Sequence, residues 1–139
     1  MRGTMYPDAM ETRAVTVTLG PTDFPTTIEA RNHVVRSDEP TDKDGTDTGL
    51  EPMELLLGSL GACTAITLRM YARRKGWALD GVHVDAAFDQ QQGTRLIHVT
   101  VRCEGELDVD QRARLLQIAN ACPVHKLLTT GAMVDTRLV

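Results

Sequence analysis

The sequence contains few aromatic residues and no apolar segment of the length that usually crosses a membrane. Aromatic residues make up 4% of the 139-residue chain, so the core must be built mainly from aliphatic side chains. The longest uncharged apolar stretch runs from Leu55 to Leu68. It is shorter than the roughly 20 residues of a typical transmembrane helix. This stretch therefore indicates a buried core helix, and we expect no membrane association.

A secretory signal, an excess of basic residues and a phosphate-binding loop are also missing. The first residues, MRGTMYPDAMETR, lack the apolar core of a signal peptide, so we expect a cytoplasmic protein. The net charge of -4 gives no electrostatic reason to expect a nucleic-acid partner. The segment GSLGAC lies inside an expected helix and does not follow a strand, which excludes a dinucleotide-binding loop.

Three cysteines are present, Cys63, Cys103 and Cys122, without any Cys-x-x-Cys pair. The four histidines are scattered and show no ligand spacing, so we expect no zinc or other metal site. Nothing in the sequence indicates a cofactor. In a reducing cytoplasm the three thiols are expected to be free, and either reactive or inert.

Hydrophobic periodicity predicts strands, a long helix, a hairpin, a second helix and a final strand. Pro52 is expected to open the long helix, which runs to about Lys75 with Gly76 as its C-cap. The sequence DVDQ resembles a capping box that starts the second helix at about Asp108. Strands and helices do not alternate, so the fold class is α+β. Alternating apolar residues predict strands over 14–20, 26–37, 82–88, 96–103 and 132–139.

Residues 1–13 are expected to form a loose N-terminus, and residues 14–139 a single domain. The polar segment Asp38–Gly49 has no apolar anchor. It is long for a structureless connection, and such loops are often functional or mobile. The basic cluster Arg73–Lys75 falls in the last turn of the long helix, where cations meet the negative end of the helix dipole. That position explains the cluster without a ligand.

Position alone gives a different expectation for each cysteine. Cys103 lies on the apolar face of its strand, so we expect a buried structural thiol. Cys63 lies in the middle of the long helix, where an apolar setting raises a thiol pKa, so its spacing favours a packing role. Cys122 directly precedes Pro123 and is the expected N-cap of a short helix, where a thiolate would be stabilised. For Cys122, reactive and structural roles both remain open.

Two segments together resemble the OsmC/Ohr family of small redox proteins, most closely its OsmC-like predicted redox protein branch. They are EPMELLLGSLGACTAITLRMYARRKGW and ANACPVHKLL, and the resemblance extends from about Asp38 to the end of the chain. It implies an OsmC-like α+β fold with antiparallel sheets and a long buried central helix, assembled as an intertwined homodimer. It also implies an antioxidant, stress-response function in which Cys63 attacks an organic hydroperoxide and becomes a sulfenic acid. Cys122 then closes a disulfide, which a dithiol reductant reopens.

One supporting residue departs from the family pattern, and the position of a second is open. In the hydroperoxide-resistance branch, a glutamate directly follows the helix-opening proline and holds an arginine that stabilises the thiolate, whereas Met53 occupies that position here. Glu54 is nine residues from Cys63 and lies on the opposite face of a straight helix. It therefore either points at the other subunit or is structural. Arg36 is the better match for the arginine, and Arg31 is the alternative.

We therefore expect a thiol peroxidase whose site residues are Cys63, Cys122, Arg36 and Glu54. The alternative is a redox-sensing or small-ligand-binding dimer of the same fold, which Met53 favours. A purely structural dimer would require both thiols to stay inert to peroxide.

Overall fold

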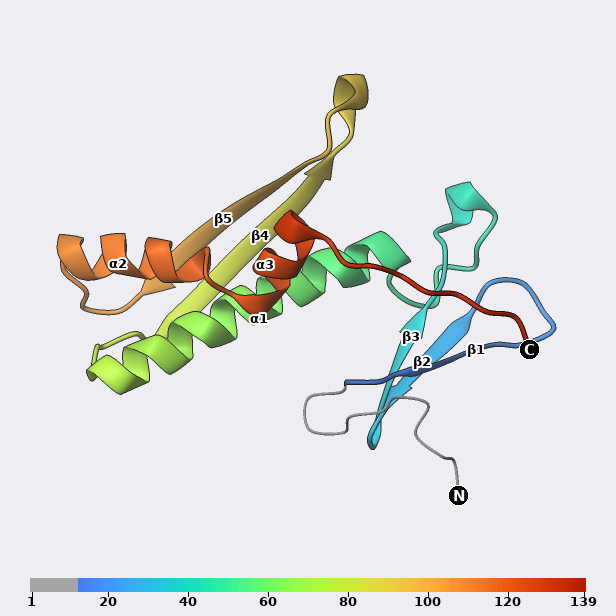
Figure 1. The fold of residues 1–139 in the computed structure, drawn as a ribbon, viewed down its shortest axis with the longest axis horizontal. Helices are drawn as coiled ribbons and strands as arrows, with labels where there is room; N and C mark the ends of the chain where they lie inside the picture. The colour runs from blue at the N-terminus through green and yellow to red at the C-terminus, as the bar shows by residue number, and fades with distance from the viewer. Residues whose placement is uncertain (1–12) are drawn as a thin grey trace. The chain divides into compact units, whose positions relative to one another are not determined.

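The structure is a computed structural model and describes residues 13–139. The chain divides into two compact units, one ending at Leu55 and the other running from Leu56 to Val139. Most of the segment predicted as a loose N-terminus lies outside the described residues. The main elements follow the predicted α+β order (Figure 1): β1 (Thr16–Leu19), β2 (Thr26–Ala30), β3 (His33–Ser37), α1 (Pro52–Lys75), β4 (Gly81–Asp89), β5 (Leu96–Glu104), α2 (Val109–Ala119) and α3 (Pro123–Thr130).

The first unit contains a three-stranded antiparallel sheet in the order β1-β2-β3. The pairing places Ile28 of β2 opposite Val17 of β1 and Val35 of β3. Arg31, with a φ of 54°, turns the chain between β2 and β3. The predicted segment 26–37 therefore forms two strands. Val17 and Val35 stay exposed, so this sheet carries an uncovered apolar surface within the single chain.

A buried carboxylate organises the polar segment that follows β3. Asp38 is 2% exposed and accepts hydrogen bonds from the Thr46 hydroxyl at 2.8 Å, the Thr48 hydroxyl at 2.7 Å and the Thr48 N–H at 3.0 Å. Led by the Thr48 hydroxyl, these bonds hold the pKa of Asp38 well below its ordinary value. The Ser37 hydroxyl donates to the Leu50 carbonyl at 2.8 Å and closes the segment. The segment thus has a polar anchor in place of an apolar one.

Helix α1 begins and ends as the sequence predicts. The Glu51 N–H donates to Oε1 of Glu54 at 3.0 Å, which satisfies a free donor at the helix start. Gly76, with a φ of 67°, follows the last turn. Within residues 13–139, α1 is the one helix that is long and apolar enough to cross a membrane. Its buried positions recur every four residues on one side, as in a core helix: Leu60, Thr64, Leu68 and Ala72.

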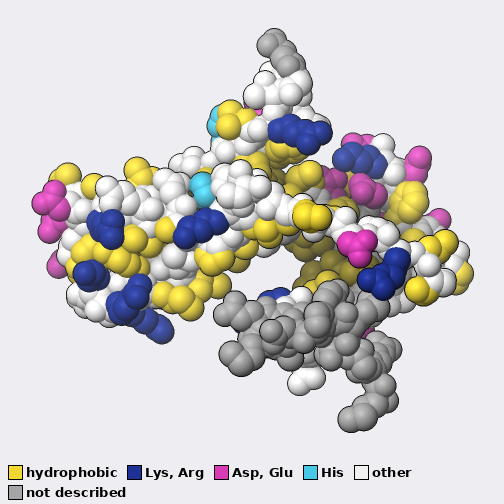
Figure 2. Space-filling view, in the orientation of Figure 1, with side chains coloured by type: hydrophobic (Ala, Val, Ile, Leu, Met, Phe, Trp, Pro, Cys, Tyr) yellow, Lys and Arg dark blue, Asp and Glu magenta, His cyan; other side chains and the backbone are white. Residues whose placement is uncertain are grey.

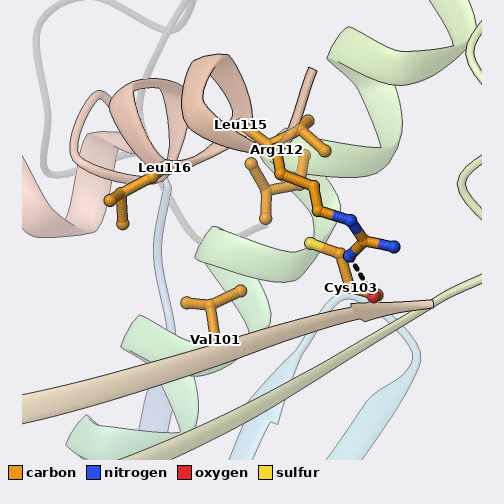
Figure 3. Close-up of a pocket in the computed structure, with 6 residues that line it drawn as sticks. Val101, Cys103, Arg112, Leu115 and Leu116 are labelled. Carbon is orange, nitrogen blue, oxygen red and sulfur yellow. Dashed lines mark hydrogen bonds between the residues drawn. The ribbon is translucent and has the colours of Figure 1, made fainter. Parts of the chain in front are cut away.

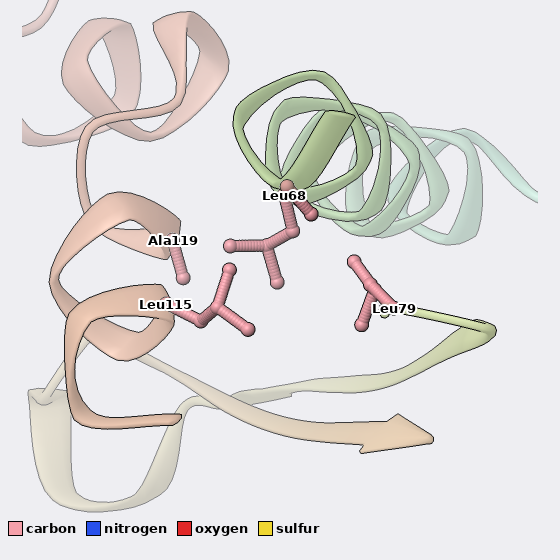
Figure 4. Packing of buried hydrophobic residues seen from close by; sticks show 5 residues of the cluster. Leu68, Leu79, Leu115 and Ala119 are labelled. Atoms are coloured by element: carbon pink, nitrogen blue, oxygen red, sulfur yellow. The ribbon is translucent and has the colours of Figure 1, made fainter. Parts of the chain in front are cut away.

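The second unit packs α1 against a two-stranded antiparallel hairpin, β4-β5, and against α2. Leu68 of α1 meets Leu79, Leu115 and Ala119 in the hydrophobic core (Figure 4). The predicted capping box is present at the start of α2. The Gln111 N–H donates to Oδ1 of Asp108 at 2.7 Å, while the Asp108 N–H donates to Oε1 of Gln111 at 2.9 Å.

Basic side chains gather at the C-terminal end of α1 (Figure 2). Arg74 and Lys75 lie 5.9 and 5.7 Å from the ring centre of Tyr71. Arg114 of α2 lies 5.6 Å from the same ring, and its Nε donates to the Tyr71 hydroxyl at 3.0 Å. This hydrogen bond is the main cause of a lowered Tyr71 pKa. The cluster is therefore accommodated by the helix dipole and an aromatic ring.

The prediction of a final strand over residues 132–139 is wrong for the single chain. Gly131, with a φ of 77°, follows the last turn of α3, and residues 131–139 form no helix or strand. Met133 and Leu138 are fully exposed. Alternating apolar residues suit a strand, but a strand forms only where another strand accepts and donates its backbone hydrogen bonds. None of the described strands pairs with this segment.

Candidate active site

The second unit brings Cys63 and Cys122 together, because the first turn of α3 packs against the middle of α1. The two thiols lie close enough for each to shift the pKa of the other. Thr64, which follows Cys63 on α1, places its hydroxyl oxygen 3.9 Å from Sγ of Cys122. Cys122 is fully buried, whereas Cys63 is half-buried. The site is therefore a pair of free thiols with unequal access to solvent.

Hydrogen-bond donors surround the sulfur of Cys122. This residue is the N-cap of α3, as predicted, and Pro123 occupies the first helical position. The His125 N–H donates to Sγ of Cys122 at 3.3 Å. The Thr64 hydroxyl is a further donor to this sulfur, in competition with the Leu60 carbonyl at 2.9 Å. A helix N-terminus together with these donors favours a thiolate at this position.

The pKa values of the two thiols are displaced in opposite directions. Burial raises the pKa of Cys122, but the hydrogen bonds that its sulfur accepts outweigh burial and leave its pKa below the ordinary value. The largest of these bonds come from the His125 N–H and from Cys63. Burial raises the pKa of Cys63, and the charge on Cys122 raises it further. In the reduced pair, Cys122 therefore ionises before Cys63.

A cavity of about 360 Å³ lies near the thiol pair, although neither cysteine lines it. It shares Leu60, one turn before Thr64 on α1, and His125 with the surroundings of the two sulfurs. Its walls are mainly aliphatic and also include a few polar side chains. The lining residues are Leu60, Arg95, Leu96, Ile97, Val99, His125, Leu128 and Thr129. Such a cavity suits a small ligand with an apolar body.

Cys103 belongs to a second cavity, of about 260 Å³, between β5 and α2 (Figure 3). It is half-buried, less than the sequence led us to expect, and its side chain packs beside the hydrophobic core. Burial raises its pKa, although Arg112 acts in the opposite direction. The Arg112 guanidinium donates to the carbonyls of Cys103 at 2.9 Å and Gly105 at 3.1 Å, so it holds the turn after β5. This environment agrees with a structural role for Cys103.

The predicted arginine and carboxylate belong to the first unit. Arg36 is an exposed residue of β3, and Arg31 occupies the turn before that strand. The Glu54 carboxylate caps the start of α1 through the Glu51 N–H. The roles of Arg36 and Glu54 toward Cys63 stay predictions. Among residues 13–139, no three His, Cys, Asp or Glu side chains converge as metal ligands do.

Reasoning from the sequence missed Thr64 as part of the site. Its position does carry a signal, because Thr64 is the one polar residue in the buried stripe of α1 and it directly follows a cysteine. A buried hydroxyl needs a hydrogen-bond partner. Here the partners are a carbonyl of its own helix and the sulfur of Cys122.

Comparisons with known proteins agree with this architecture. The sequence matches the model of the OsmC-like protein family over residues 45–137. A search of curated protein sequences finds no match. Among solved structures, a putative osmotic stress induced and detoxification response protein from Psychrobacter arcticus aligns with a TM-score of 0.71 and 24% identity. The alignment covers 88% of this chain and 90% of that one.

Two further solved structures are similar in fold. A putative organic hydroperoxide resistance protein from Vibrio cholerae, with captopril in one active site, has a TM-score of 0.61 and 20% identity, with coverage of 87% and 88%. A predicted redox protein from Legionella pneumophila, also named an organic hydroperoxide resistance protein, has a TM-score of 0.59 and 16% identity, with coverage of 87% and 91%. These likenesses confirm the predicted α+β fold with a long central helix. With the family match over most of its length, the chain belongs to the OsmC-like protein family.

Proposed function

We propose that this protein is a thiol-dependent peroxidase that reduces organic hydroperoxides through Cys63 and Cys122. The observation that supports this most directly is the proximity of two free thiols, one fully buried at a helix N-terminus and the other half-buried. Solved structures of the same fold include proteins named for resistance to organic hydroperoxides. The proposal places the reaction in the reducing cytoplasm, where a dithiol can regenerate the pair.

The proposed cycle begins with the reduced pair in the state in which Cys122 has ionised and Cys63 holds the remaining proton. When that proton passes from Cys63 to Cys122, the Cys63 thiolate attacks one peroxide oxygen and the O–O bond breaks. The departing alkoxide takes the proton from Cys122 and leaves as an alcohol, so Cys63 becomes a sulfenic acid and Cys122 a thiolate again. Cys122 then attacks Sγ of Cys63 and expels hydroxide, which closes the disulfide. A dithiol returns the two electrons.

The cavity beside the pair supports an alkyl substrate. Leu96, Ile97 and Leu128 form part of an aliphatic wall that can bury the apolar body of a hydroperoxide. Each CH₂ group of an alkyl hydroperoxide that is buried there contributes about 0.8 kcal/mol to binding. Hydrogen peroxide has no CH₂ group and gains none of this binding energy. The protein should therefore prefer alkyl hydroperoxides to hydrogen peroxide.

We propose that the working form is a homodimer. Leu56, Cys63 and Met70 are spaced by seven residues on α1, and Ile66 lies on the same face. Leu56, Ile66 and Met70 are 38%, 55% and 64% exposed. An exposed apolar stripe at this spacing suits a second copy of the same helix. Arg36, with Arg31 as the alternative, and Glu54 complete the proposed site.

Oxidation by one equivalent of cumene hydroperoxide, followed by peptide mapping, tests the proposal. We expect a Cys63–Cys122 disulfide in the wild type, and sustained turnover with dithiothreitol as the dithiol. Cys63→Ser should abolish turnover, whereas Cys122→Ser should consume about one equivalent and accumulate sulfenic acid. Cys103→Ser is the matched control and should keep full turnover. Three reduced thiols after minutes with peroxide, or unchanged turnover in Cys63→Ser, would contradict the proposal.

A redox-sensing or small-ligand-binding dimer is the second candidate. Met53 at the position of the family glutamate and the raised pKa of Cys63 favour it, because both make Cys63 a slower nucleophile. The same experiment separates the two functions. Formation of the disulfide without repeated turnover in the presence of dithiothreitol would support the sensor.

A further inference from the structure

The two sulfurs of the pair differ in access and in hydrogen bonding, which determines how their disulfide reopens. We propose that the reductant attacks Sγ of Cys63 and that Cys122 is the leaving group. This inference rests on the proposed function, because it concerns the Cys63–Cys122 disulfide of that cycle. It specifies which sulfur the reductant attacks, since a disulfide can be attacked at either sulfur.

Access favours attack at Cys63. Cys122 is 0% exposed beneath the first turn of α3, so an incoming thiolate cannot reach its sulfur without displacing that turn. Cys63 is half-buried on α1. A helical side chain leans over the turn that precedes it, and there Ser59 and Gly58 are exposed. Because Cys63 lies on the face proposed to meet a second copy of α1, the reductant enters at the edge of that contact, whereas Cys122 is already fully buried within its own chain.

The groups around Cys122 favour its departure. As the S–S bond breaks, the electron pair moves to Sγ of Cys122, which lies 3.3 Å from the His125 N–H and 3.9 Å from the Thr64 hydroxyl. These donors stabilise the emerging thiolate, as does the positive end of the α3 dipole. Attack in the opposite direction would expel Cys63, whose pKa is raised by burial. The thiol with the lower pKa leaves faster.

The exchange balances with a dithiol as the only co-reactant. A bond forms between the first reductant sulfur and Sγ of Cys63, and the Cys63–Cys122 bond breaks with its electrons on Cys122. The second reductant thiolate then attacks the first reductant sulfur and releases Cys63, which takes up a proton. The dithiol is thereby oxidised to a disulfide by two electrons. Hydroperoxide and reductant thus react at the same sulfur, each with a different redox state of the pair.

The direction of attack can be measured without any peroxide. The Cys103→Ser protein is oxidised with diamide and exposed briefly to 2-mercaptoethanol, a monothiol that cannot resolve its own mixed disulfide. The reaction is quenched with acid, alkylated with N-ethylmaleimide and mapped by peptide mass spectrometry at several early times. We expect mercaptoethanol on Cys63 and maleimide on Cys122 to exceed the reverse pattern by at least about tenfold at zero time.

Three results would overturn the inference. They are equal or inverted labelling of the two sulfurs, a disulfide that diamide cannot form, and a preference that persists in concentrated urea. In urea both sulfurs are exposed and the α3 N-terminus is lost. We therefore expect the ratio of mercaptoethanol on Cys63 to mercaptoethanol on Cys122 to fall toward one. Because diamide replaces the hydroperoxide, a failure of peroxidase activity alone would leave this measurement intact, and the two failures can be told apart.

Discussion

Two adjacent leucines of α2 provide a matched test of the core of the second unit. Leu115 is 1% exposed and packs in the cluster with Leu68 and Ala119, whereas Leu116 is 63% exposed. Truncating a buried leucine to alanine costs about 2–5 kcal/mol. Leu115 also lines the cavity of about 260 Å³, so one side of its side chain already lacks packing partners and truncation removes fewer contacts. We therefore expect Leu115→Ala to cost about 2–3 kcal/mol, the lower part of that range.

Leu116→Ala is the control, because it makes the same chemical change one position away at an exposed site. We expect it to change stability by no more than about 0.5 kcal/mol. Urea unfolding followed by circular dichroism measures both variants, at one protein concentration so that association does not shift the comparison. In a chain of this size, the loss at Leu115 corresponds to a fall in Tm of about 7–10 °C. Equal losses at the two positions, or less than about 1 kcal/mol at Leu115, would refute the packing argument.

Two further predictions concern pH. Asp38 has a depressed pKa in the folded state, so its stabilising effect is complete above the ordinary value of 3.8 and is lost as pH falls below it. Asp38→Asn should therefore weaken the dependence of the free energy of unfolding on pH below about pH 5. Urea unfolding across that pH range measures this dependence. If it is unchanged, the Asp38 carboxylate does not stabilise the folded state in this way. Thr64→Val removes a donor to Sγ of Cys122 and should raise the pKa of that thiol. Thiolate absorbance in a Cys63→Ser, Cys103→Ser background measures this pKa against Thr100→Val as the exposed control, and a pKa that stays constant or falls would contradict the geometry.

Local signals in the sequence predicted the helical elements well. Pro52 and Gly76 set the ends of α1, Asp108 and Gln111 started α2, and Cys122 became the N-cap of α3. Each of these depends on residues within one or two helical turns. The stability of each helix end is therefore set largely by the neighbouring residues in the sequence.

Features that depend on distant residues could not be predicted in the same way. Asp38 gathers donors from eight and ten residues further along the chain, and composition alone made that segment look unanchored. The proximity of Cys63 to Cys122 came from a family resemblance, because no spacing rule joins the middle of one helix to the start of another. The order of their pKa values depends on burial and on the His125 N–H, which only the folded chain specifies. The final segment has the alternation of a strand and lacks a pairing partner in the single chain.

The proximity of the two thiols also bears on how the protein would withstand excess oxidant. In the proposed cycle, the newly formed sulfenic acid on Cys63 lies beside Cys122, the thiol whose pKa is lowered. An intramolecular reaction of this kind outpaces an encounter with a second oxidant molecule, because its partner is held in place. The irreversible steps to sulfinic and sulfonic acid require that second encounter. In that cycle, Cys122 would protect its neighbour from permanent inactivation.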